Sequence, residues 1–130
     1  MVFYVDTSAA VKLVVAERGS SALVKWAVAR EHQLVSSDLL RTELLRAVRR
    51  GAPARMERAR AVLDALTIVT MPTSTFERAA SLDSELPRSL DALHLAAALE
   101  LGDELDGLVA YDDRLAEAAR RYGITVVSPR

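Results

Sequence analysis

The N-terminal run V-F-Y-V-D-T-S, at residues 2–8, constrains this chain more than any other stretch. Four successive apolar residues of high β-propensity fit a strand that is covered on both faces, as strands of parallel α/β sheets are. Asp6 ends the run, and Thr7 and Ser8 then begin a helix. Ligands of open α/β sheets bind beyond the carboxyl ends of the strands, so Asp6 is a candidate site residue. Taken alone, Asp6 is more simply interpreted as a cap of the following helix.

The composition narrows the class of protein. A chain of 130 residues that is 51% hydrophobic and 27% charged fits a single domain, residues 1–130, with its own core. It has no apolar run of about 18 residues, and Asp6 interrupts the N-terminus too early for a signal peptide, so we expect a cytoplasmic protein without a membrane partner. The absence of cysteine excludes disulfides and thiolate nucleophiles, and the wide separation of His32 and His94 argues against a zinc hydrolase. Any metal would therefore be held by oxygen.

Short β-type runs alternate with helical patterns along the chain. The predicted strands are 2–5, 33–37, 67–71, 107–111 and 124–127. The predicted helices are 8–17, 22–30, 39–50, 54–66, one that begins at residue 72 or 73, 90–101 and 113–122. This alternation predicts an α/β fold, a short parallel sheet of about five strands with helices on both faces. Right-handed crossovers then bring the carboxyl ends of all the strands to one edge.

Three further acids occupy positions that lead to the same edge. Glu43 lies on the apolar stripe of the helix 39–50, and Asp91 lies in the first turn of the helix 90–101. Asp112 ends the fourth strand as Asp6 ends the first. Carboxylates that converge repel one another and either take up protons or bind cations, so we expect at least one raised carboxyl pKa. An all-oxygen set favours Mg²⁺ or Mn²⁺, which orient a phosphodiester, lower the pKa of a bound water and stabilise the leaving oxygen.

Each of these acids also has a simpler interpretation. Glu43 can pair with Arg46, three residues later on the same helix. An acid at position 91 is favoured by the helix dipole whatever its function. His94, one turn after Asp91, is more typical of a buried, hydrogen-bonded histidine than of a metal ligand.

Positive charge is concentrated between residues 41 and 60. Seven arginines face two glutamates there, so this region has a charge of +5 and the remainder, given the net charge of −1, has −6. A basic region beside an acidic centre suits a phosphate-bearing ligand that approaches bound cations. The alternative is that these arginines form ordinary solvated helix faces.

Four segments together resemble a PIN-domain protein and, more narrowly, the VapC-type toxins of bacterial toxin–antitoxin pairs. They are D-T-S at 6–8, R-T-E-L-L-R-A at 41–47, R-S-L-D-A-L-H-L-A-A-A at 88–98 and L-V-A-Y-D-D-R-L-A-E-A-A at 108–119. The resemblance runs the whole length and is most specific around Asp91. It implies a Mg²⁺- or Mn²⁺-dependent endoribonuclease that cleaves RNA with a metal-activated water. It also implies catalytic, metal-holding acids with Ser8 in support, the acids being Asp6, Glu43, Asp91 and Asp112.

The resemblance further implies two protein partners, a cognate antitoxin that covers or distorts the site and a second copy of the toxin in a homodimer. The broad apolar arcs of the helices 8–17 and 22–30 are candidates for antitoxin contact or dimerisation. In the family pattern the ligand is the first acid of its pair, Asp112, and Asp113 lies in the helix turn. Contact with RNA or antitoxin is predicted for four arginines, Arg41, Arg46, Arg49 and Arg50.

Two other classes of function stay open. A PIN fold that only binds RNA or protein is one, although acids at all four positions argue against it. A receiver-like Mg²⁺-binding signalling domain is the other. In a receiver domain the phosphorylated aspartate would follow the third strand, but the run 67–71 leads into Pro72 without an acid, and no lysine follows the fifth strand.

Overall fold

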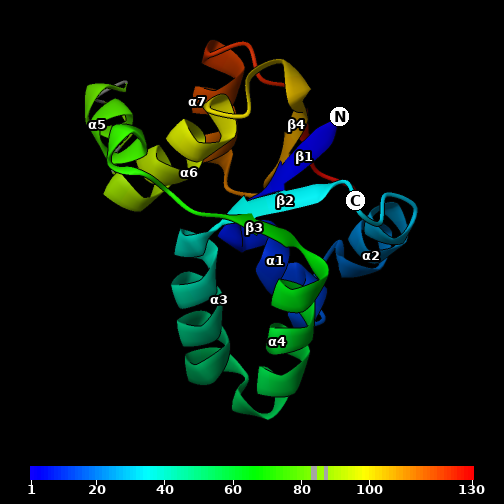
Figure 1. The fold of residues 1–130 in the computed structure, drawn as a ribbon. Coiled ribbons are helices and arrows are strands. Elements are labelled where there is room, and N and C mark those ends of the chain that lie inside the picture. Colours follow the sequence, from blue (N-terminus) through cyan, green and yellow to red (C-terminus); the bar gives the residue numbers. More distant parts are fainter. Residues whose placement is uncertain (83–84, 87) are drawn as a thin grey trace.

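The computed structural model describes residues 1–82, 85–86 and 88–130, and these residues form one five-stranded sheet with helices on both faces (Figure 1). The strands are β1 (Val2–Val5), β2 (Leu34–Ser37), β3 (Thr67–Val69), β4 (Leu105–Val109) and β5 (Val126–Val127). The helices are α1 (Thr7–Val14), α2 (Ser20–Val28), α3 (Asp38–Gly51), α4 (Met56–Ala65), α5 (Thr73–Ser81), α6 (Ser89–Leu99) and α7 (Asp113–Arg121). Two 3₁₀ turns, η1 (Pro53–Arg55) and η2 (Gly102–Glu104), precede α4 and β4.

The sheet has the strand order β3-β2-β1-β4-β5, and every neighbouring pair is parallel. Helices α1 to α4 cover one face, and α6 and α7 cover the other, with α5 packed against α6 (Figure 1). The predicted α/β class, the five parallel strands and the helices on both faces are confirmed. No helix in the described part of the chain is both long enough and apolar enough to span a bilayer.

The central strands are apolar throughout because each of their faces has a helical layer. In β1, Tyr4 joins the core cluster of α6 and α7, and its neighbour Val5 joins the cluster of α1 to α4. Leu108 and Val109 of β4 divide between the same two clusters. Successive side chains of a strand point to opposite faces, so a strand buried on both sides is a continuous apolar run.

Helix α1 is apolar on nearly all sides because it lies among other elements. It packs against α2, α3 and α4 as well as the sheet, and Ala9, Ala10 and Val14 are fully or almost fully buried. It ends at Val14 rather than at the predicted residue 17, because Val15 adopts an extended conformation.

Several predicted boundaries differ from the structure. Strand β4 runs from Leu105 to Val109 rather than over 107–111, because its pairing with β1 begins opposite Val2. Strand β5 contains Val126 and Val127 alone, since only these two residues are in register with β4. The helix predicted over 90–101 instead begins at Ser89 and ends at Leu99, and Arg88 occupies the cap position.

The strand order places its switch point between β1 and β4. The chain moves outward from β1 to β2 and β3 and then returns to β4 on the other side of β1. Ligands of open α/β sheets bind at such a switch point, beyond the carboxyl ends of the two strands that flank it. Asp6 directly follows β1, and Asp112 lies three residues beyond the end of β4.

We expect Gly107→Ala to destabilise the fold by about 1–3 kcal/mol, the usual cost of overpacking a core. A Cβ there would lie 3.0 Å from the Thr125 carbonyl oxygen and 3.3 Å from side-chain atoms of Phe3 and Val127. Gly51→Ala is the matched control, because a Cβ at the end of α3 would meet nothing within 4 Å and should stabilise by about 0.4–1 kcal/mol. Urea unfolding of both variants measures the difference. Equal stability of the two would contradict the described packing of β4 against β1 and β5.

Candidate active site

Asp6 is buried at the carboxyl end of the central strand. Only 2% of it is exposed. Its Oδ1 accepts hydrogen bonds from the Ala9 backbone N–H at 2.9 Å and from Ser8 Oγ at 2.7 Å, so Asp6 does cap α1. Burial is the main cause that raises the pKa of Asp6 to about 6, and the charge of Asp112 adds to it. A helix cap does not require a desolvated acid. Capping alone therefore does not explain why this carboxyl group is buried.

Ser8 connects the end of β1 to the segment that follows β4. Its Oγ donates to Asp6 and accepts a hydrogen bond from the Tyr111 backbone N–H at 2.9 Å. Tyr111 directly precedes Asp112, so this hydroxyl fixes the spacing between the two strand-end acids. The Asp6 backbone N–H also donates to the Val109 carbonyl at 3.1 Å, which extends the β1–β4 pairing to the site.

Asp112 caps α7 in the way that Asp6 caps α1. Its Oδ1 accepts from the backbone N–H groups of Arg114 and Leu115, each at 3.0 Å. Asp113 is the first residue of α7 and is exposed. Of the two adjacent acids, it is thus Asp112 whose charge reaches the buried groups of the site, since it raises the pKa of both Asp6 and Asp91.

Glu43 is held by two side chains from other helices. Its Oε1 lies 2.6 Å from His94 Nε2 and accepts a hydrogen bond of 2.6 Å from Thr7 Oγ1. Burial raises the pKa of Glu43, but these hydrogen bonds and the charges of His94 and Arg88 outweigh it, so the net pKa is lowered. Glu43 thus pairs with His94 across the α3–α6 contact, and the local pair with Arg46 considered from the sequence is not what the structure shows.

His94 continues this hydrogen-bonded chain into the sheet. It is 2% exposed, and its Nδ1 lies 2.8 Å from the Tyr4 hydroxyl, which in turn lies 2.8 Å from Ser37 Oγ. Burial raises the pKa of Tyr4, so its phenol stays protonated. Since an ionised Glu43 only accepts, Nε2 of His94 carries the proton shared with it. Residues on β1, β2 and α6 therefore fix the position of one carboxylate on α3.

Asp91 has a buried oxygen without a partner. Among the described residues, its Oδ2 is the buried side-chain oxygen or nitrogen atom that has no hydrogen bond. Arg88 Nε is 3.9 Å from this oxygen, which is an ion-pair distance but too long for a hydrogen bond. Burial and then the charge of Asp112 raise the pKa of Asp91. A buried oxygen left in this state is unfavourable unless another group, such as a cation, satisfies it.

The pKa of two acids is raised, as the sequence led us to expect, but the leading cause differs. For both Asp6 and Asp91 it is burial, and repulsion from Asp112 comes after it. The sequence places acids at a sheet edge without giving the depth to which each is covered, so the size of the desolvation effect could not be predicted from it.

The donor set fits a hard divalent cation in its chemistry. All the candidate ligands are carboxylate oxygens, and one of them accepts no hydrogen bond. The charge of Asp112 raises the pKa of both Asp6 and Asp91, and the charge of Glu43 also raises that of Asp91. Within the described ranges, however, no three acidic or histidine side chains are arranged so that they could already hold an ion. Glu43 is turned to His94, and Asp6 and Asp112 each use Oδ1 as a helix cap. A bound ion would thus draw on the second oxygens of these groups.

The predicted arginines lie along α3 and are all exposed: Arg41, Arg46, Arg49 and Arg50. The last three line one hollow between α3 and α4, and Arg41 is not part of its lining. Sequence reasoning missed the residues that position Glu43, although two signals pointed to them. Thr7 follows Asp6 directly, and Ser37 ends a strand at the same sheet edge.

We expect wild type to lose up to about 3 kcal/mol of stability relative to Asp6→Asn as the pH rises from about 4 to about 8 in EDTA. The folded carboxyl binds its proton up to a pKa of about 6, against an ordinary 3.8, so its contribution becomes unfavourable as the pH rises through this range. Asn caps a helix as well as Asp does, which removes the cap from the comparison. Urea unfolding measures the difference, with exposed Asp113→Asn as the control. A difference that does not change with pH would contradict a desolvated Asp6.

Comparison with known proteins shows which family this chain belongs to. The PIN domain family model matches residues 3–121. Ribonuclease VapC47 of Mycobacterium tuberculosis (strain CDC 1551 / Oshkosh) is 40% identical over 130 residues, which covers 97% of this chain and 96% of the relative. Ribonuclease VapC46 of Mycobacterium tuberculosis (strain ATCC 25618 / H37Rv) is 38% identical over 126 residues, with the same coverage of 97% and 96%.

Two solved structures share the fold. The Sarcin-Ricin loop cleaving toxin VapC20 of Mycobacterium tuberculosis superposes with a TM-score of 0.77 at 16% identity, over 98% of this chain and 99% of that one. VapBC2 of Rickettsia felis, bound to a DNA fragment from its promoter, gives a TM-score of 0.69 at 16% identity over all of both chains. The family model covers most of the chain and the two ribonucleases nearly all of it, so this protein belongs to the PIN-domain family and, within it, to the VapC group.

Proposed function

We propose that this protein is a metal-dependent endoribonuclease, the toxin of a toxin–antitoxin pair, and that Mg²⁺ or Mn²⁺ is its cofactor. One observation supports this most strongly: Asp91 has a buried oxygen that accepts no hydrogen bond, and the charge of Asp112 acts on both Asp91 and Asp6. Such a site is unfavourable when empty and suits a cation. The named VapC relatives are ribonucleases, and RNA is the substrate that we propose here.

The proposed ligands are Asp6, Glu43, Asp91 and Asp112, with Ser8 in support. When bound, the cation would lower the pKa of a water and neutralise charge on the phosphodiester. The residues of the chain supply position: Ser8 sets the spacing of the two strand-end acids, and His94 with Thr7 orients Glu43. The helix N-termini of α1 and α7 favour negative charge at the same edge.

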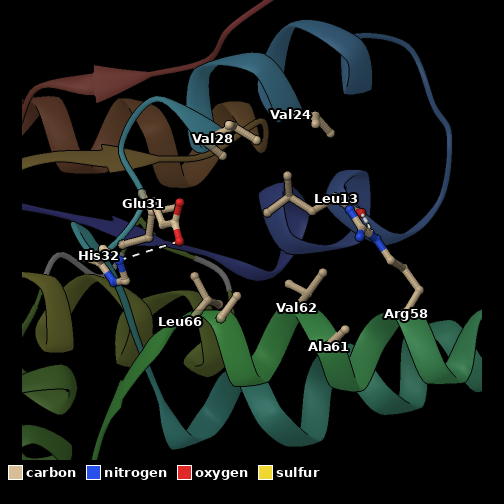
Figure 2. Close-up of a pocket in the computed structure, with 12 residues that line it drawn as sticks. Leu13, Val24, Val28, Glu31, His32, Arg58, Ala61, Val62 and Leu66 are labelled. Atoms are coloured by element: carbon tan, nitrogen blue, oxygen red, sulfur yellow. Dashed lines mark hydrogen bonds and ion pairs between the residues drawn. The ribbon is translucent and has the colours of Figure 1, made fainter.

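The cognate antitoxin is the proposed occupant of an apolar groove between α1, α2 and α4 (Figure 2). The groove has a volume of about 260 Å³, and Val24 and Val28 of α2 lie across it from Leu13 and Val62. Val28 is 69% exposed, which is unusual for a valine in an apolar lining. One solved structure of this fold is that of VapBC2, and we propose that a partner chain covers the groove of this protein.

Four further proposals complete this assignment. Residues 1–130 form a single PIN-like nuclease domain. The protein works in the cytoplasm, and it forms a homodimer. Arg41, Arg46, Arg49 and Arg50, which are exposed on α3, contact RNA or the antitoxin.

We expect the purified protein to cut structured RNA with Mg²⁺ or Mn²⁺, to lose this activity in EDTA, and to lose about 10²–10³-fold of it in Asp91→Asn, the scale of removing one preorganised electrostatic group. Asp113→Asn is the matched control and should stay close to wild type, whereas Asp112→Asn should not. Gel electrophoresis of end-labelled RNA over time gives the rates. Cleavage that continues undiminished in EDTA would reject the metal mechanism, and a larger loss in Asp113→Asn than in Asp112→Asn would reassign the ligand.

We expect Val28→Glu to weaken antitoxin binding at least about tenfold, because it places an unpaired charge in an apolar contact. The probe is the product of the reading frame directly upstream, purified with this protein. Trp26 is the single tryptophan of the chain and lies on α2, so its emission reports the binding. Phe76→Glu on α5 is the control, since Phe76 is also exposed, at 48%, but lies outside the groove. Equal affinity of the two variants would show that the antitoxin binds elsewhere.

A further inference from the structure

A basic hollow lies between α3 and α4, away from the apolar groove. Four guanidinium groups line it, those of Arg46, Arg49, Arg50 and Arg60, and its volume is about 510 Å³. Thr42 and the half-buried side chains of Leu45 and Met56 complete the lining, and the latter two pack against the core. The first three arginines come from α3, and Arg60 comes from α4, so two helices of one hairpin direct positive charge into the same space.

These guanidinium groups have no anionic partner in the described part of the chain. No hydrogen bond or ion pair joins any of the four to another described residue. Other arginines do have partners: Arg78 pairs with Glu100 at 3.1 Å, and Arg58 donates to the Leu13 carbonyl. Four like charges that share a hollow repel one another, so an anion that entered it would relieve the repulsion and find donors that are free.

Helix α3 contributes residues both to the hollow and to the acidic site. Glu43, Arg46 and Arg50 stand at positions i, i+3 and i+7, and they therefore share one face of the helix. At 1.5 Å per residue, Arg46 is about 4.5 Å and Arg50 about 10 Å farther along the helix axis than Glu43. A chain of phosphates that crosses the acidic site can thus continue onto these arginines without a change of direction.

We propose that this hollow binds the phosphates of the RNA strand next to the cleaved bond, on the side that runs along α3. This inference rests on the proposed ribonuclease function. Arg60 of α4 has the same role as the three arginines of α3, so the RNA strand is contacted from two helices. Arginine suits it because its planar fork makes two hydrogen bonds to one phosphate.

An acidic protein segment is the competing ligand, and two observations favour RNA. The apolar groove, lined by Ala61, Val62 and Ala65 of α4, is a separate surface from the hollow, which is lined by Met56 and Arg60 of the same helix. Two residues of the hollow, Arg46 and Arg50, also share a helix face with Glu43, whereas the groove is lined by no residue of α3.

The test is the salt dependence of RNA binding by Arg46→Gln/Arg60→Gln. Each phosphate contact to a single strand contributes about 0.7 to the slope of log K against log salt, so this pair should reduce the slope by about 1.4. The measurement uses Asp91→Asn protein with Mg²⁺ and single-stranded RNAs of increasing length. Protein with the unaltered hollow should bind RNA more tightly as nucleotides are added beyond the acidic site. Protein with the two substitutions in the hollow should not show this increase in affinity.

The matched control is Arg18→Gln/Arg120→Gln, which removes the same charge from two exposed arginines outside the hollow and should leave the slope nearly unchanged. Arg49→Gln/Arg50→Gln should repeat the effect of the first pair, which guards against a single misfolded variant. Equal slopes for the hollow and control pairs would overturn the proposal. It would also be overturned if the hollow pair kept its RNA slope and lost antitoxin affinity instead. RNA that is shortened during the assay would count against the proposed role of Asp91, a separate result from the slope.

Discussion

The desolvation of Asp6 at the end of the central strand is the constraint on which the rest of this site depends. Strand β1 is covered on both faces, so a residue that follows it directly starts out in the interior. Its carboxylate can remain there because α1 supplies a backbone N–H and Ser8 supplies a hydroxyl, yet burial still raises its pKa to about 6. A group kept in this way stores unfavourable free energy that a cation would release, which is the usual balance between stability and a functional site.

Helix α3, which carries Glu43, is held by a hydrogen-bond network that reaches across the sheet. Ser37, Tyr4 and His94 form a continuous line of hydrogen bonds that ends on Glu43. Every hydrogen bond in this line is 2.6–2.8 Å long. The line therefore joins β2, β1, α6 and α3 in turn, and the carboxylate of Glu43 is its last member. Polar networks of this kind are stabilising only when every member is satisfied, and the unpartnered oxygen of Asp91 beside it marks the place where the arrangement is incomplete.

Much of the fold follows from the sequence, because buried parallel strands are continuous apolar runs, and two of them are followed by an acid within three residues. What could not be predicted is set by distant contacts. The partner of Glu43 is His94, 51 positions away, and the local alternative, Arg46, instead faces the basic hollow. The inclusion of Arg60 depends on how α4 packs beside α3, and the limits of β4 depend on its register with β1. Helix periodicity gives faces, but it does not give the neighbour that each face meets.

The central claim is that the converging acids form one cation site, and that binding of the cation displaces the proton of Asp6. Titration calorimetry with Mn²⁺ near pH 6, carried out in buffers of different ionisation enthalpy, measures this directly, because ligands must lose their protons when a metal binds. We predict that wild type binds Mn²⁺ with release of a substantial fraction of a proton, and that Asp6→Asn abolishes the proton release and weakens binding. Mn²⁺ binding that is equally tight and equally proton-linked in Asp6→Asn, or no binding by wild type, would contradict the account.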